Sequence, residues 1–187
     1  MDEFSYLSVL LSIILGLAIT QVLKGFRGVV LARSRARSYW PVLAWAALLL
    51  LINVQSWWAM FDLRSVIHWT FFKFCFVLAQ TITLYMLAAI VFPDFVGEKV
   101  DLKEHYYDHA RLFFSLLILV LLISLSKSIA FTGHLSDRTD VTFHLCFMAT
   151  CVTAMLVRSE WYHKALPVIA ILSFVAYISV LFVTLPK

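Results

Sequence analysis

Two histidines in the segment 104–109 have the spacing that a metal site on a helix requires. His105 and His109 stand four residues apart, so they would share one helical face. Imidazole nitrogens bind zinc and related metals, and the neighbouring carboxylates of Glu104 and Asp108 could orient or complete such a site. The same residues also fit a solvated helix start, whose acidic groups offset nearby Lys and Arg. Both interpretations remain open at this point.

A second set of polar residues lies inside segments that are otherwise apolar. Its members are Asn53, Gln55, Ser56, Lys73, Gln80, Lys127 and His144. Polar groups inside a membrane are costly unless they pair with one another or line a wet cavity. Four segments contribute at similar depth, which predicts an outward-facing site for a ligand or an ion. Alternatively, the amides join neighbouring helices, and the two lysines extend toward the headgroups from positions near helix ends.

Several sequence motifs that name a reaction are absent. The chain has no G-x-x-x-x-G-K-[ST], H-E-x-x-H, G-x-S-x-G or T-V-G-Y-G string. Cys75, Cys146 and Cys151 lie in apolar runs without C-x-x-C spacing and are interpreted as small buried hydrophobic residues. A haem between His68 and His144 would need two facing rings at one depth. No residue is assigned a catalytic role, and no cofactor is indicated.

The elements that hold these residues are predicted from composition and from apolar run length. Hydrophobic residues make up 63% of the chain and charged residues 14%, against about 45–50% and about 25% in soluble domains. Apolar runs of about 20 residues recur, each long enough to cross about 30 Å of hydrocarbon. We predict one all-α integral membrane domain, residues 1–187, with six transmembrane helices at about 4–23, 40–62, 69–92, 112–131, 141–157 and 165–185.

An amphipathic cytoplasmic segment is expected at 94–111, between the third and fourth helices. Asp101 and Glu104 have the spacing of a capping box, so a helix should begin there. That helix would place Leu102, Tyr106, His109 and Phe113 on one face. A polar turn that ends at Asp140 should separate the fourth and fifth helices.

A basic linker after the first helix orients the protein. It carries Lys24, Arg27, Arg33, Arg35 and Arg37, which we expect to anchor the chain at a membrane surface with anionic headgroups. The loops after the first, third and fifth helices together carry ten of the fifteen Lys and Arg residues. By the positive-inside rule these loops face the cytoplasm, and both termini lie outside. Because the basic residues cluster at membrane boundaries, nucleic acid is not expected as a partner.

Three strings resemble an uncharacterised group of small bacterial polytopic inner-membrane proteins of unknown function. They are SVLLSIILGLAITQVL, SYWPVLAWAALLLLINVQSWW and VDLKEHYYDHARLFF. The resemblance covers most of the first two helices and the entrance to the fourth. It implies an all-helical bundle in a bacterial inner membrane and supplies no activity.

The sequence therefore leaves three hypotheses about function. In the first, a multi-pass inner-membrane protein passes or senses a small ion or solute through the outward-facing polar cluster, as a homo-oligomer. In the second, the chain is a non-transporting accessory or scaffold subunit that docks on a membrane partner protein. In the third, His105 and His109 form an interfacial metal site.

Overall fold

The computed structural model describes residues 3–66, 68–95 and 100–181. These residues form six α-helices, one 3-10 helix and two short strands, in the order α1 (Glu3–Leu31), β1 (Ala36–Arg37), α2 (Trp40–Ala59), η1 (Met60–Ser65), α3 (Phe71–Ile90), β2 (Val100–Asp101), α4 (Leu102–Thr132), α5 (Arg138–Leu156) and α6 (Glu160–Leu181).

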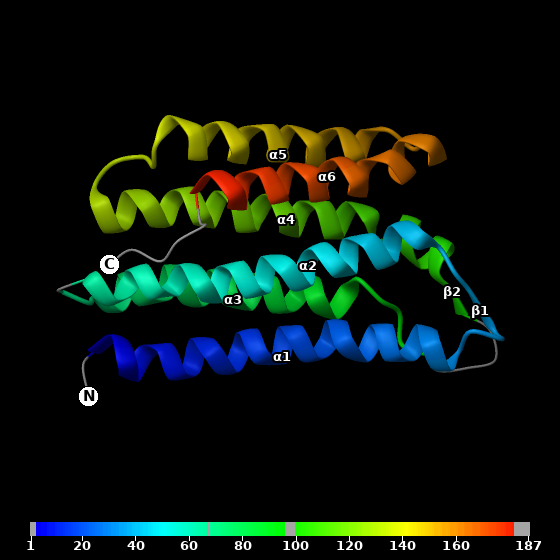
Figure 1. The fold of residues 1–187 in the computed structure, drawn as a ribbon, viewed down its shortest axis with the longest axis horizontal. Coiled ribbons are helices and arrows are strands. Elements are labelled where there is room, and N and C mark those ends of the chain that lie inside the picture. Colours follow the sequence, from blue (N-terminus) through cyan, green and yellow to red (C-terminus); the bar gives the residue numbers. More distant parts are fainter. Residues whose placement is uncertain (1–2, 67, 96–99, 182–187) are drawn as a thin grey trace.

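The helices lie side by side with their long axes roughly aligned, from α1 at one edge to α5 at the other (Figure 1). Helix α3 packs against α1 and α4, α4 packs against α5, and α2 contacts both α1 and α6. The predicted all-α class is confirmed. In the described part of the chain, six helices are long and apolar enough to cross a membrane, which is compatible with a multi-pass membrane protein.

Two of the predicted transmembrane spans, 4–23 and 112–131, are parts of longer helices. Helix α1 continues through Lys24 and Arg27 to Leu31, and α4 begins at Leu102, directly after the predicted cap at Asp101. With 29 and 31 residues, each is about 45 Å long at about 1.5 Å per residue, more than the hydrocarbon thickness. Hydropathy marks only the apolar part of a helix, whereas these helices continue beyond it.

The segment 94–111 is therefore mostly the first part of α4, although residues 96–99 lie outside the described chain, as do 182–185 of the last helix. Asp101 is the N-cap of α4: its carboxylate accepts hydrogen bonds from the backbone N–H groups of Lys103, at 2.8 Å, and Glu104, at 3.2 Å. Leu102, Tyr106 and Phe113 are buried. His109 is exposed but lines one small hollow together with Tyr106 and Phe113, so it lies on the same side of α4.

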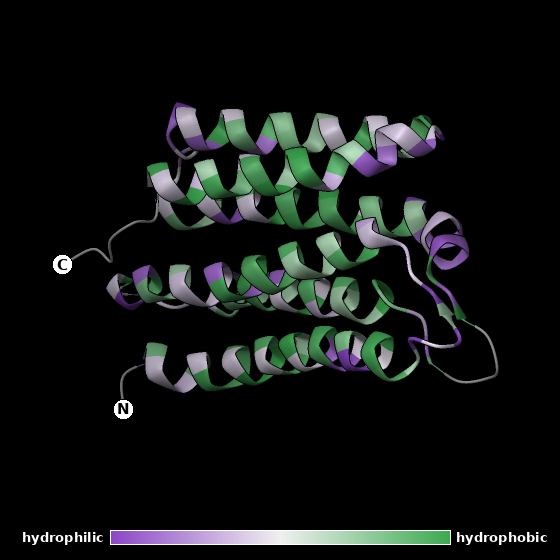
Figure 2. Cartoon of the chain, turned by 45° about the vertical axis from the view of Figure 1, so that its right-hand side comes forward, coloured by the Kyte–Doolittle hydropathy of each residue, from purple (hydrophilic) through white to green (hydrophobic). Residues whose placement is uncertain are grey.

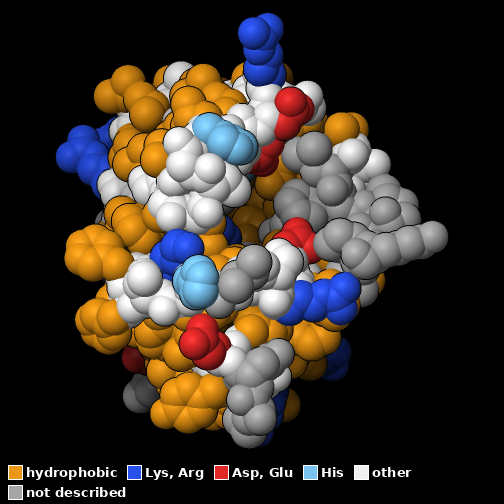
Figure 3. Space-filling view, turned by 90° about the vertical axis from the view of Figure 1, so that its left-hand side faces the viewer, with side chains coloured by type: hydrophobic (Ala, Val, Ile, Leu, Met, Phe, Trp, Pro, Cys, Tyr) orange, Lys and Arg blue, Asp and Glu red, His pale blue; other side chains and the backbone are white. Residues whose placement is uncertain are grey.

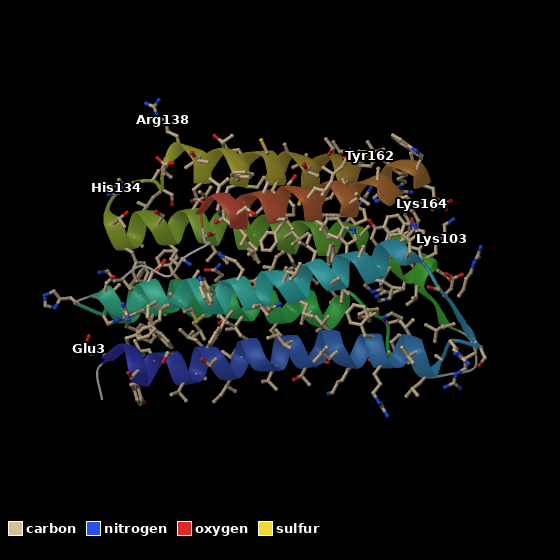
Figure 4. All side chains as sticks on the ribbon, viewed as in Figure 1. Glu3, Lys103, His134, Arg138, Tyr162 and Lys164 are labelled. Carbon is tan, nitrogen blue, oxygen red and sulfur yellow. The ribbon has the colours of Figure 1, made fainter. Side chains whose placement is uncertain are left out.

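The ends of the bundle differ. At the end we call the basic end, β1 pairs with β2 in parallel, with Ala36 opposite Val100. Two ion pairs join separate segments there, Arg37–Asp101 at 3.4 Å and Lys103–Glu160 at 2.7 Å, and Lys164 pairs with Glu160 within α6 at 2.9 Å. Hydrophilic residues gather at this end in Figure 2, and Figure 4 places Lys103 and Lys164 there.

The five linker cations, Lys24, Arg27, Arg33, Arg35 and Arg37, are exposed. Their anchoring role stays a prediction.

Aromatic side chains pack tightly inside the basic end. The Trp45 ring forms T-shaped pairs with Phe113 and Phe114, and the ring centroids are 5.4 Å apart in each pair. His163 is 1% exposed. Its Nε2–H donates to the Val157 carbonyl at 2.7 Å, so its Nδ1 accepts from the Tyr106 hydroxyl at 2.9 Å. Both ring nitrogens are satisfied, and the histidine is a structural link between α4 and α6.

Helix α1 begins and α6 ends at the opposite end, which we call the terminal end (Figure 1). Figure 3 looks onto this end, where acidic, basic and histidine side chains lie beside hydrophobic ones. Figure 4 places Glu3, His134 and Arg138 there. Gly133, with φ of +80°, ends α4 in the left-handed conformation that glycine adopts without strain, and Asp137 caps α5.

Candidate functional site

A cavity of about 610 Å³ lies among α2, α3, α4, α5 and α6, toward the terminal end. Its walls include the apolar side chains of Leu84, Leu117 and Phe174. Polar side chains line it as well, among them Gln55, Ser56, Gln80, Ser124, His144 and Tyr177. Four of the seven residues predicted for the ligand or ion site are thus brought to one cavity.

A smaller hollow of about 80 Å³ adjoins this cavity and adds a fifth predicted residue, Lys127. The two spaces share Gln55, Ser56, Gln80, Ser124 and Tyr177 in their linings. Lys127 Nζ donates to Gln80 Oε1 at 2.9 Å, which joins α4 to α3. Because Lys127 and Ser124 are three residues apart on α4, they face the same side, and the hollow forms a polar extension of the cavity.

A hydrogen-bonded chain of side chains crosses α6, α5 and α4 beside the cavity. The Tyr177 hydroxyl donates to Asp140 Oδ1 at 3.0 Å. His144 Nδ1 lies 2.9 Å from the Asp140 carbonyl and 3.3 Å from Asp140 Oδ1. Its Nε2 lies 3.2 Å from the Ser124 hydroxyl, which is the donor when the ring is neutral. The partly buried carboxylate of Asp140 thus lies between a phenol and an imidazole.

The other two predicted residues lie elsewhere. Lys73 Nζ donates to the His68 carbonyl at 3.2 Å and lies 5.6 Å from the centre of the Phe131 ring. Asn53 is 0% exposed, and its Nδ2 donates to the Leu49 carbonyl at 2.8 Å. Its Oδ1 has no hydrogen-bond partner among the described residues. Neither side chain lines the cavity, so neither contributes to this site directly.

Three residues of the site were not singled out from the sequence: Ser124, Asp140 and Tyr177. Asp140 was assigned to a turn, yet α5 begins two residues earlier, at Arg138. The Asp-x-x-x-His spacing to His144 is a signal that could have revealed the pair, because residues four apart are neighbours on a helix. No local pattern identifies Tyr177, since its partner lies on another helix.

In the histidine pair at the basic end, one nitrogen of each ring is hydrogen-bonded to a backbone carbonyl. The rings of His105 and His109 stack with centroids 4.3 Å apart. His105 Nε2 bonds the Ile90 carbonyl at 2.9 Å, and His109 Nδ1 bonds the His105 carbonyl at 3.0 Å. Among the described residues, no group of three or more His, Cys, Asp or Glu side chains could hold a metal ion. Metal binding by these two histidines stays a prediction, which elemental analysis of purified protein would test.

The fold and the site together define an all-α protein. Its six apolar helices are compatible with a multi-pass membrane protein, and five of them, α2 to α6, line a cavity with polar groups toward one end. Comparisons with protein-family models, with curated proteins and with solved structures find no match.

Proposed function

We propose that the protein is a multi-pass protein of a bacterial inner membrane that binds a small solute or ion in the cavity and passes or senses it. The observation that carries the proposal is the convergence of polar side chains from five helices on one cavity in the terminal half of the bundle. Polar groups that only join helices need no space between them, whereas the paired groups of this site lie beside a cavity of about 610 Å³.

Orientation supports an outward-facing site. The basic loops lie at the end of the bundle opposite to the start of α1 (Figure 1). The residues that line the cavity lie toward the terminal end. The positive-inside rule puts the basic end at the cytoplasm, so the cavity faces the outer side. On this proposal both termini are also outside.

Cysteine accessibility tests whether the site is open to water from outside. The native cysteines are first replaced, and Ser56→Cys is compared with Val54→Cys, which points outward from the same helix with a 49% exposed side chain. A charged, membrane-impermeant thiol reagent added outside reconstituted vesicles should modify the cysteine at position 56. The cysteine at position 54 should stay unmodified, because lipid covers it. If the reagent modifies neither the cysteine at position 56 nor the one at position 54, the result would contradict a site that is open to water from outside.

A second candidate, an accessory or scaffold subunit, is favoured by one observation on α1. A Cβ added at Gly16 would meet nothing within 4 Å among the described residues, and Thr20, one turn later, is exposed. Small residues at this spacing let another helix approach closely. Purification in mild detergent separates the two: a different protein at fixed stoichiometry, lost in Gly16→Leu, favours the accessory function. A homo-oligomer instead favours the function proposed first, binding of a small solute or ion in the cavity.

A further inference from the structure

The shape of the cavity restricts what it can hold. Most of its wall is hydrocarbon from side chains such as Leu84, Leu117, Phe147 and Phe174, and its polar groups gather toward the terminal end. A volume of about 610 Å³ lies in the range of about 300–1,000 Å³ that holds organic ligands of drug size. A hydrated inorganic ion would leave the apolar wall without contacts. An occupant with an apolar body and one polar head would satisfy both parts.

Charge in the adjoining hollow points to the sign of that head. Lys127 carries an ammonium with three N–H donors, and the hydrogen bond described for it, to Gln80, takes one. Asp140, the acidic residue beside the cavity, already accepts from Tyr177 and lies in contact with His144. Asp140 and Asp62 both lie near enough to Lys127 to attract its charge, but Asp62, on η1, is exposed. Arg138 adds a second cation to the cavity lining. The N–H donors of Lys127 that Gln80 does not use therefore favour an occupant with an anionic head.

The cavity is accessible along the side of the bundle. Thr142 and Cys146 line it and are also exposed. Both belong to α5, the helix at the edge of the bundle in Figure 1, and lie within its candidate membrane span, Arg138–Leu156. In a bilayer, an opening at this position meets lipid chains, so a lipid-soluble molecule could enter without crossing water.

We propose that the occupant is a single-chain amphiphile with an anionic head, whose chain lies along the apolar wall and whose head binds Lys127. This inference rests on the proposed function and specifies its ligand class. Lys127 is the head-binding residue, and Gln80 positions its side chain. An anion beside an amine also favours the charged form of that amine.

Photolabelling with three probes of equal chain length tests the class of ligand. Hexadecanoate, hexadecanol and hexadecyltrimethylammonium, each with the same diazirine on the chain, are added to the protein in nanodiscs. Labels are then mapped by mass spectrometry. We expect hexadecanoate to label the segment 142–150 at concentrations about ten- to a hundredfold lower than the other two, as one charge-assisted contact implies.

Variants then assign the preference to one cation. Lys127→Met should reduce labelling by hexadecanoate to the level of hexadecanol, whereas Lys127→Arg should keep the preference. Lys73→Met is the matched control, because Lys73 lies at the same end but outside the cavity, and it should leave labelling unchanged.

The possible failures are distinguishable. Equal labelling of 142–150 by all three probes would overturn the anionic head while leaving a binding cavity in place. Labelling of 142–150 no stronger than that of the lipid-facing Val9 and Ile13 on α1 would overturn the cavity site and the proposed function with it. If Lys127→Met does not fold, the comparison of the three probes on the parent protein still decides.

Discussion

The two ends of the bundle use the same kinds of polar residue to different effect. At the basic end, His163 has a partner on each ring nitrogen, and Glu160 contacts both Lys103 and Lys164. Tyrosine rings surround His163. At the terminal end, His144 and Lys127 are also hydrogen-bonded, yet they lie beside cavities of about 610 and 80 Å³. Polar side chains thus join the helices at one end and line a cavity at the other.

This difference predicts that stability and binding separate along the length of the bundle. Packed groups satisfy each other, so a substitution at the basic end should lower the free energy of unfolding. Side chains that face an open space have fewer contacts to lose, so a substitution at the terminal end should mainly affect binding. Four substitutions test the separation, from the largest expected effect on stability to the smallest.

Gly25→Ala should have the largest effect. A Cβ at Gly25 would overlap the ring of Phe92, which is buried and packs edge-on against Phe26. Overpacking of this kind destabilises by about 1–3 kcal/mol, and the fixed ring favours the upper part of that range. Gly16→Ala is the control: it meets open space and should be neutral or slightly stabilising, because alanine favours helix. Denaturant unfolding in detergent measures both, and equal losses would show that α1 does not pack as described.

Tyr106→Phe should come next. It removes the hydroxyl that donates to His163 Nδ1, leaving a buried acceptor without a partner at a cost of about 1–3 kcal/mol. Tyr162→Phe provides a comparison, because that hydroxyl bonds the exposed Thr153 instead and should cost less. Probe labelling in the cavity should be the same in both variants. A loss of labelling in Tyr106→Phe would show that the two ends are coupled.

Asp101→Ala should lower stability by about 0.5–2 kcal/mol through loss of the N-cap of α4. Burial raises the pKa of Asp101, but hydrogen bonds from the Glu104 and Lys103 backbone and the nearby Arg37 guanidinium outweigh it, so the pKa lies below its ordinary value of 3.8. The resulting stabilisation is fully present above that ordinary value and is lost as pH falls through the lowered pKa. Unfolding measured across acidic pH should show this loss in the parent and not in the variant.

Thr142→Trp should change stability least, within about 0.5 kcal/mol, because Thr142 is exposed at the side of α5. The large ring would fill the opening of the cavity and should abolish labelling of 142–150 by hexadecanoate. Leu145→Trp, at an exposed position that does not line the cavity, should leave labelling intact. If both variants are labelled like the parent, the amphiphile does not enter between these residues.

The sequence predicted the class of fold and part of the site because the relevant signals are local. Apolar run length determined the number of helices, and the spacing of Asp101 and Glu104 located the start of α4. Depth along each helix placed Gln55, Ser56, Gln80, Lys127 and His144 at a common level, and all five line the cavity or the hollow.

The rest depends on rotation about each helix axis, which residue depth does not determine. Lys73 lies on the same helix as Gln80 but turns toward the His68 carbonyl, and Asn53 bonds its own helix at Leu49. His163 lies between the helices predicted at 141–157 and 165–185. Only the fold brings Tyr106 of α4 within hydrogen-bond distance of its ring. Pairings of this kind arise between helices and carry no signature in either segment alone.

The most direct test of the account is a high-resolution structure of the protein in lipid nanodiscs with hexadecanoate brominated along its chain. Bromine density is expected inside the cavity between α2 and α5, with the carboxylate within hydrogen-bond distance of Lys127 Nζ. A cavity closed by side chains, or bromine found only along the outer faces of the helices, would contradict it.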